Sequence, residues 1–95
     1  EVKSSFESGE YNYQLSSNFN LKEIFNFLKE KFANKGKIIL LDGLTIEHPT
    51  WRFNVRGSNT EPLIRLNVEA NNKKILENKL KNIQLFFGKL GLKKT

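Results

Sequence analysis

The chain contains no cysteine and no methionine, only one histidine, and no apolar run long enough to cross a bilayer. Without cysteine it can form neither a disulfide nor a thiolate metal site, which is compatible with a cytoplasmic location. Its first residues lack the pattern of a signal peptide. Because methionine is absent, residue 1 is not a translation start, so we expect the chain to be a piece of a longer protein.

Candidates for catalysis are equally scarce. His48, the single histidine, precedes a proline at the end of a predicted strand and has no cysteine to pair with, so we assign it an ordinary surface role. The acidic residues are spaced singly, without the Asp-x-Asp clustering typical of a divalent-metal site. The sequence therefore predicts no catalytic residue and no metal ligand within the chain.

The composition is that of one folded domain. Its 95 residues are 38% hydrophobic and 12% aromatic, which is enough for a single core. The net charge of +6 comes mostly from scattered lysines, which on helix surfaces mainly serve solubility. The arginines, by contrast, all lie between residues 52 and 65, and arginines gathered at one place more often recognise an anion.

The hydrophobic pattern predicts the order β-α-β-β-β-β-α. Residues 1–9 are polar and serine-rich, so we expect an interdomain linker there and the folded domain at residues 10–95. The Asp42-Gly43 pair predicts a tight hairpin turn. Alternating residues predict strands at 11–15, 38–41, 44–47, 51–56 and 62–70.

Two amphipathic helices complete the predicted fold. Asn20 and Glu23 form a capping-box pattern before the first helix, and Gly36 is expected to adopt the left-handed conformation after it. The second helix is expected to begin near Asn71 or Asn72. The apolar stripes are Leu21, Ile24, Phe25, Leu28 and Phe32, then Leu76, Leu80, Ile83, Phe87 and Leu90. We predict an α+β two-layer sandwich, a largely antiparallel sheet with both helices on one face.

The most informative stretch is the polar loop Arg56-Gly57-Ser58-Asn59-Thr60-Glu61-Pro62 between two predicted strands. Arginine offers a planar, permanently charged fork, and the hydroxyls of Ser58 and Thr60 are rotatable donors. Gly57 lets the backbone turn in ways that a β-carbon would obstruct, so that successive N–H groups could converge on an anion. This combination suits a phosphate. A polar turn that binds nothing is the other interpretation of the loop by itself.

The stretch WRFNVRGSNTEPLIRLNVEA, from Trp51 to Ala70, resembles the C-terminal, fourth domain of the α-D-phosphohexomutases, the phosphomannomutase and phosphoglucomutase family. The stretches LDGLTIEH and SGEYNYQL resemble the same domain, so the likeness covers nearly the whole chain. Asn59 stands where phosphoglucosamine mutases typically have glycine, which favours the phosphomannomutase/phosphoglucomutase branch. Gly57 replaces a residue that is often proline or alanine, which would make the empty loop more mobile.

The resemblance implies a parent enzyme, an isomerase that interconverts hexose 1-phosphate and 6-phosphate through a phosphoserine enzyme and a bisphosphate intermediate. The serine and the aspartates that hold Mg²⁺ would lie in other domains, so this chain alone would be inactive. The expected partners are mannose or glucose phosphate and the other domains, without nucleic acid or membrane. Arg65 is expected to pair with Glu69 or a neighbouring strand. By resemblance, the residues that hold the non-reacting phosphate are Arg56, Gly57, Ser58, Asn59 and Thr60.

Two other functions remain open at this point. A basic nucleic-acid-binding α+β module would use the open face of the sheet, and it predicts aromatic side chains there and a steep dependence of affinity on salt. The alternation instead places Trp51 and Phe53 on the apolar face. A purely structural or dimerising domain would use an unpaired strand edge.

Overall fold

The computed structural model describes residues 5–15, 19–58 and 61–95. Its elements are β1 (Phe6–Glu7), β2 (Tyr11–Gln14), α1 (Leu21–Phe32), β3 (Lys37–Ile39), β4 (Leu44–Glu47), β5 (Trp51–Gly57), β6 (Leu63–Ala70), α2 (Lys73–Lys89) and β7 (Lys93–Lys94). The strands form one antiparallel sheet in the order β3-β4-β5-β6-β2-β7, with β1 also paired to β6. The predicted order is confirmed, and the short strands β1 and β7 are additions to it.

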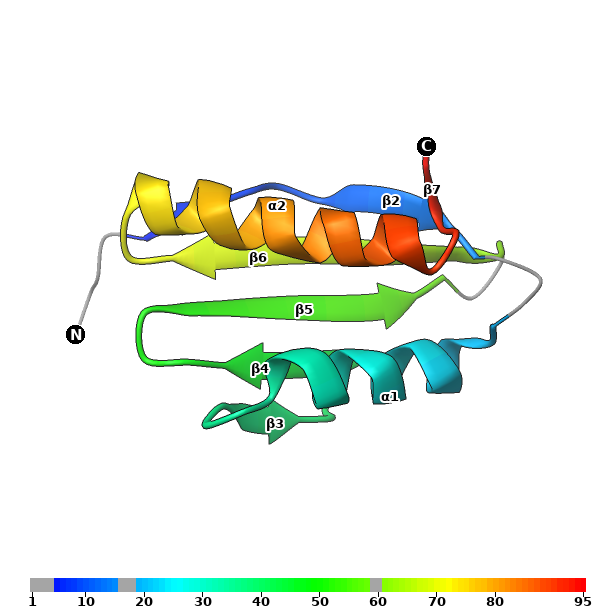
Figure 1. Cartoon of the computed structure of the whole chain (residues 1–95), viewed down its shortest axis with the longest axis horizontal. Coiled ribbons are helices and arrows are strands. Elements are labelled where there is room, and N and C mark those ends of the chain that lie inside the picture. Colours follow the sequence, from blue (N-terminus) through cyan, green and yellow to red (C-terminus); the bar gives the residue numbers. More distant parts are fainter. Residues whose placement is uncertain (1–4, 16–18, 59–60) are drawn as a thin grey trace.

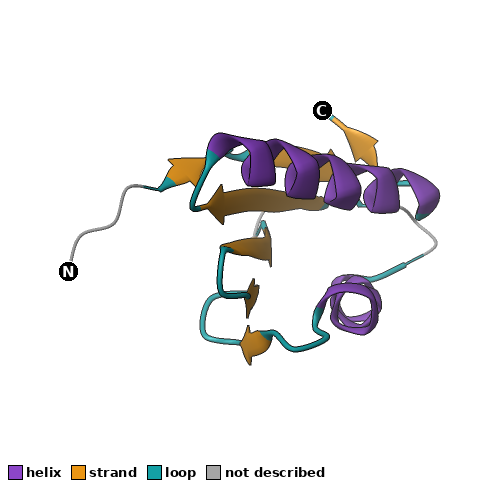
Figure 2. Cartoon of the chain, turned by 60° about the vertical axis from the view of Figure 1, so that its left-hand side comes forward, coloured by secondary structure: helices purple, strands orange, loops and turns teal. Residues whose placement is uncertain are grey.

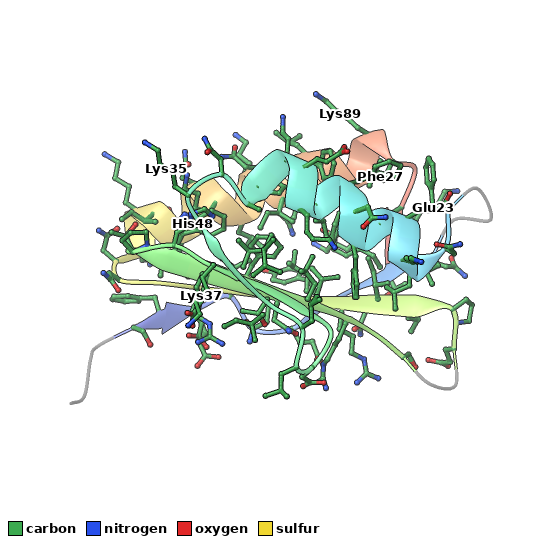
Figure 3. All side chains as sticks on the ribbon, turned by 90° about the horizontal axis from the view of Figure 1, so that it is seen from below. Glu23, Phe27, Lys35, Lys37, His48 and Lys89 are labelled. Carbon is green, nitrogen blue, oxygen red and sulfur yellow. The ribbon has the colours of Figure 1, made fainter. Side chains whose placement is uncertain are left out.

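Both helices cover the same face of the sheet. Helix α2 lies along β6 and β2, and α1 lies against β4 (Figure 1). In Figure 2, α1 is seen end-on while α2 is seen along its length, so the axes of the two helices are inclined to each other. Figure 3 shows both helices on one side of the strands. The predicted two-layer α+β sandwich is confirmed. Neither helix of the described residues is long and apolar enough to span a membrane.

The core fills the space between the helices and the sheet. Alternate residues of β5 and β6 point into it, as the sequence predicts, and α1 and α2 contribute one apolar stripe each. Burying each such side chain contributes about 1.5–3 kcal/mol. The central buried residues are Phe53, Val55, Ile64, Leu66 and Val68 from the strands, and Ile24, Leu28, Ile83 and Phe87 from the helices.

The predicted helix starts are confirmed. The Asn20 side chain accepts a hydrogen bond from the Glu23 backbone N–H at 2.8 Å, and the Glu23 carboxylate accepts one from the Asn20 N–H at 2.9 Å. The Asn72 side chain likewise accepts a bond from the Ile75 N–H at 2.8 Å. These bonds satisfy donors that the first turn of a helix leaves without partners.

The predicted conformation at the end of α1 is wrong. Lys35, with φ of 64°, takes the left-handed conformation that we expect at Gly36. The reason for glycine at position 36 is steric. A β-carbon there would lie 2.8 Å from Cε1 of His48 and 2.9 Å from Cγ2 of Ile46. The glycine lets the chain pass close to β4 and the residue that follows it.

The β3–β4 hairpin is wider than the predicted two-residue turn. Four residues, 40–43, join the two strands, since β3 ends at Ile39 and β4 begins at Leu44. Only Gly43 has a positive φ, of 78°. Leu41, which we expect in the strand, lies at the tip with its side chain 91% exposed. The turn residues are therefore correctly predicted, but the strand before them is too long.

Strands β1 and β2 are two parts of one strand interrupted by a β-bulge. Glu7 lies opposite Glu69, and Tyr11 lies opposite Leu66, so residues 8–10 face only residues 67–68 of β6. One extra residue in one strand defines a bulge. Gly9 supplies the positive φ, of 77°. Residues 6 and 7, assigned to the linker from the sequence, thus pair with β6, while the domain boundary at residue 10 stays a prediction.

Candidate functional site

The predicted phosphate loop lies where β5 ends. Arg56 and Gly57 are the last two residues of β5, and Ser58 follows directly. Asn59 and Thr60 lie outside the described residues. The described chain resumes at Glu61, two residues before β6.

Hydrogen bonds close the base of this loop. The Ser58 N–H donates to the Leu63 carbonyl at 3.0 Å, which extends the β5–β6 pairing by one step. The Ser58 hydroxyl oxygen accepts from the Glu61 N–H at 3.3 Å. Ser58 is therefore held on both its backbone and its side chain, and the loop starts from a fixed base.

Gly57 occupies an extended strand position rather than an unusual backbone conformation. It pairs with Ile64 and is not among the residues with positive φ. A β-carbon here would instead lie 2.8 Å from Cδ2 of Leu21, the first residue of α1. The predicted need for backbone freedom is therefore wrong for Gly57 itself. Its small size places the N-terminal turn of α1, which carries a partial positive charge, beside the loop.

Arg56 is on the open face of β5 and already has a carboxylate partner. Its Nη2 lies 3.1 Å from Oε2 of Glu10, and the two side chains are 42% and 45% exposed. An ion pair this exposed contributes about 0–1 kcal/mol. Arg56 is thus fixed weakly enough to exchange this partner for another anion.

Arg65 faces Arg56 directly across the β5–β6 pairing. Like charges in this position repel each other. No ion pair joins Arg65 to Glu69 or to any other carboxylate of the described chain, so the expected pairing is not found. Its Nε is buried without a hydrogen-bond partner among these residues, as is Oδ1 of Asn12 on the neighbouring strand. The two arginines therefore place two like charges opposite each other on this part of the sheet.

Two hollows meet at Arg56. The first, here the loop hollow, has a volume of about 360 Å³ and is lined by Leu21, Phe25, Asp42, Gly43, Arg56, Gly57 and Ser58. The second, here the face hollow, has about 220 Å³ and is lined by Glu10, Asp42, Asn54, Arg56, Arg65, Leu66 and Asn67. The structure therefore brings three of the predicted site residues together at one concave surface and adds Glu10 and Asp42, which sequence reasoning missed.

His48 is more than a surface residue. Its ring stacks on Trp51, with centroids 4.7 Å apart and planes 10° apart, and its Nε2 lies 2.7 Å from the carbonyl oxygen of Phe32. Because a carbonyl can only accept, Nε2 carries the proton and donates. This bond satisfies one of the last carbonyls of α1. The role of His48 is to join the helix end to the sheet.

The open face of β5 carries Arg52, Asn54 and Arg56, while Trp51 and Phe53 point toward the helices and are 8% and 1% exposed. A nucleic-acid module would present such aromatics on the open face for base stacking. The structure of β5 gives that alternative no support.

Comparison with known proteins shows the family of the chain. Residues 12–83 match the family model described as phosphoglucomutase/phosphomannomutase, C-terminal domain. The chain is 40% identical over 83 residues to a phosphomannomutase of Methanocaldococcus jannaschii, a match that covers 87% of this chain and 18% of the relative.

Two further relatives show the same pattern. A phosphomannomutase of Vibrio cholerae is 39% identical over 62 residues, or 64% of this chain and 13% of the relative. One from Escherichia coli is 69% identical over 29 residues, or 30% of this chain and 6% of the relative. The chain thus spans less than a fifth of the length of these relatives. By its family match and its identity to these proteins, the chain belongs to the C-terminal domains of the phosphoglucomutase/phosphomannomutase family.

Proposed function

We propose that the chain is the substrate-phosphate-binding domain of a phosphomannomutase/phosphoglucomutase that interconverts hexose 1-phosphate and 6-phosphate. The observation that carries this proposal is the convergence of Arg56 and Ser58 on the loop hollow, beside the N-terminal turn of α1. A guanidinium, a hydroxyl and a helix N-terminus are all groups that favour a phosphate. Asn59 and Thr60 would complete the same loop.

The proposed role explains how one site can serve both directions of a mutase reaction. The reaction passes through a bisphosphate that turns around, so each phosphate must in turn be the one that does not react. A loop that grips only the phosphate accepts the sugar in both orientations. Charge-assisted hydrogen bonds from Arg56 would contribute about 1.5–3 kcal/mol each. Such positioning is the main source of catalysis in phosphoryl transfer.

The remaining chemistry belongs to other parts of the proposed parent. Among the described residues, no group of three or more His, Asp or Glu side chains is arranged to hold a metal ion. A phosphoserine and a Mg²⁺ ion in other domains and the inactivity of this chain alone stay predictions from the resemblance. A cytoplasmic location stays a prediction from the sequence. Contacts from this domain to a substrate held by the others would favour closure of the parent enzyme around it.

Replacing Arg56 in the full-length parent tests the proposal. Arg56→Ala should raise KM and lower kcat/KM at least tenfold, since each 1.4 kcal/mol of lost transition-state stabilisation is a factor of ten. Steady-state kinetics with glucose 1-phosphate and mannose 1-phosphate would measure it.

Arg52→Ala is the matched control. Arg52 lies on the same face of β5, pairs with Glu47 at 3.0 Å, and lines neither hollow. It should leave kcat/KM within about twofold of the wild-type value, since removing an exposed ion pair costs little. If Arg56→Ala behaved like Arg52→Ala, the proposed grip on the phosphate would be wrong.

A further inference from the structure

We infer that Glu10 is an internal competitor for the phosphate: its carboxylate occupies Arg56 in the empty domain and must release the guanidinium when a phosphate monoester binds. The inference rests on the proposed function for the identity of the ligand. Glu10 would then control the phosphate affinity of the loop, although it belongs to a segment far from the loop in the sequence. Glu10 and Arg56 are 46 positions apart in the chain.

The path of the Glu10 side chain shows that this contact is built by the sheet. Glu10 directly precedes β2, which pairs with one side of β6, while Arg56 belongs to β5 on the other side. The carboxylate therefore reaches across β6 on the open face to lie 3.1 Å from Arg56. Both side chains, with Arg65 and Asn67, line the face hollow.

The β-bulge at residues 8–10 determines which face Glu10 occupies. If the register of β1 continued without interruption, residue 10 would lie opposite Leu66, whose side chain is buried in the core. The extra residue instead puts Tyr11 opposite Leu66 and turns Glu10 to the open face, because neighbouring strand residues alternate between faces. Bulges often re-aim a side chain beside a functional site. Here the bulge aims a carboxylate at the proposed phosphate-binding arginine.

The charges around Arg56 determine whether Glu10 strengthens or weakens phosphate binding. The Glu10 carboxylate pairs with Arg56, which lies opposite Arg65, and Asp42 lines the same face hollow. A phosphate monoester carries up to two negative charges near neutral pH, so it attracts Arg56 more strongly than the single charge of Glu10 does. Glu10 could help phosphate binding by holding Arg56 in position, but an exposed ion pair contributes little to this. Its carboxylate also repels a bound phosphate dianion, and this repulsion opposes binding. Removing the charge of Glu10 should therefore strengthen phosphate binding.

A titration of the ¹⁵N-labelled 95-residue chain with glucose 1-phosphate at low salt tests the inference. The Ser58 amide resonance reports binding in the wild type, Glu10→Gln, Glu47→Gln and Arg56→Ala, and the Arg56 Nε–H resonance reports it in the three proteins that keep Arg56. Glu10→Gln should lower the dissociation constant about two- to fivefold, the range that corresponds to one exposed ion pair. Glu47→Gln, which breaks the Arg52 pair on the same face, should leave it unchanged.

The outcomes separate the inference from the proposed function. Binding by Glu10→Gln that is equal to or weaker than wild type overturns the inference, since Glu10 would then be inert or would position Arg56 for the ligand. An Arg56 Nε–H resonance that does not move in ligand-free Glu10→Gln also overturns it. Wild-type resonance shifts that persist in Arg56→Ala, or the absence of shifts in every variant, overturn the proposed function instead.

A second variant tests the bulge without altering any charge. Alanine at Gly9 meets no neighbouring atom within 4 Å but disfavours the φ of 77° that the bulge requires. Gly9→Ala should therefore weaken the Glu10–Arg56 contact and shift the dissociation constant in the same direction as Glu10→Gln. A shift in the opposite direction, in a variant whose amide spectrum shows it folded, contradicts the assigned role of the bulge.

Discussion

At the scale of single residues, Gly43 is the glycine whose replacement the structure tolerates least. It has a φ of 78°, and a β-carbon there would lie 2.5 Å from the carbonyl oxygen of Val55, a backbone atom of the central strand β5. A side-chain tip can move aside, but this oxygen cannot move without disturbing the sheet. Gly43 also lines the loop hollow, so the turn and the proposed site depend on the same residue.

Gly43→Ala should lower the free energy of unfolding by about 2–3 kcal/mol, because left-handed strain and the backbone contact add together. Gly88→Ala is its control, since Gly88 lies inside α2 with open space around it. That substitution should stabilise the chain by about 0.5–1 kcal/mol through helix propensity. Urea denaturation measures both. Equal stability of the two variants would mean that the turn does not have this geometry in solution.

At the scale of elements, the sequence predicts those helices and strands whose signals lie within a few neighbouring residues. Helices α1 and α2 are predictable because their caps and apolar stripes lie within a few residues of each other. Strands β1 and β7 are not, because two residues such as Lys93-Lys94 contain no alternation and pair only where a neighbouring strand offers an edge. Leu92, buried beside β7, escapes prediction for the same reason.

The side chains that cap the two helices give a prediction for these elements. Asn20 takes part in two reciprocal hydrogen bonds with Glu23, whereas Asn72 makes one. Alanine at either position removes one side-chain acceptor, while residue 20 keeps the backbone N–H that donates to Glu23, so Asn20→Ala and Asn72→Ala should each cost about 0.5–2 kcal/mol in the free energy of unfolding.

Asn34→Ala is the control for both caps. The Asn34 side chain is exposed and makes no hydrogen bond among the described residues, so its replacement should stay within about 0.5 kcal/mol of wild type. Urea or thermal unfolding of the three variants compares them. A cost for Asn20→Ala no larger than that for Asn34→Ala would show that the capping box contributes nothing to stability.

At the scale of the whole molecule, the site is less predictable than the fold. The loop is recognisable because its residues are contiguous, and Arg56, Gly57 and Ser58 do lie together. The Glu10–Arg56 pair is not, because it depends on strand order and on a bulge that changes which face Glu10 occupies. The expected Arg65–Glu69 pair fails because both residues lie in β6, where four residues span about 13 Å.

Tyr13 connects the two layers and makes global stability depend on pH. Its ring packs edge-on against Phe87 of α2 at 4.9 Å. Burial raises the pKa of the Tyr13 phenol above its ordinary value of 10.0, opposed by a hydrogen bond with Gln84 and assisted by nearby Tyr11. A raised pKa in the folded state means that folding favours the protonated phenol. The stabilisation is complete below about pH 10 and is lost as the pH rises through the folded pKa.

We therefore expect the free energy of unfolding to fall more steeply above about pH 10 in the wild type than in Tyr13→Phe, which has no phenol to ionise. One group contributes at most about 1.4 kcal/mol per pH unit. Urea unfolding at several pH values measures the difference, because the contributions that are common to both proteins cancel in it. Parallel pH profiles for the two proteins would contradict the contribution of Tyr13.

The ends of the strand order have a consequence for how copies of this domain behave beside one another. On one side the sheet ends in the three-residue strand β3, which contains Lys37, and on the other in β7, Lys93–Lys94. When two copies approach along these edge strands, their lysine ammonium groups repel each other before backbone hydrogen bonds can form. The strands are also short, so they could form only a few such hydrogen bonds. Fibril-like stacking is thereby disfavoured, so concentrated samples are expected to stay dispersed, and to cluster when salt screens the repulsion.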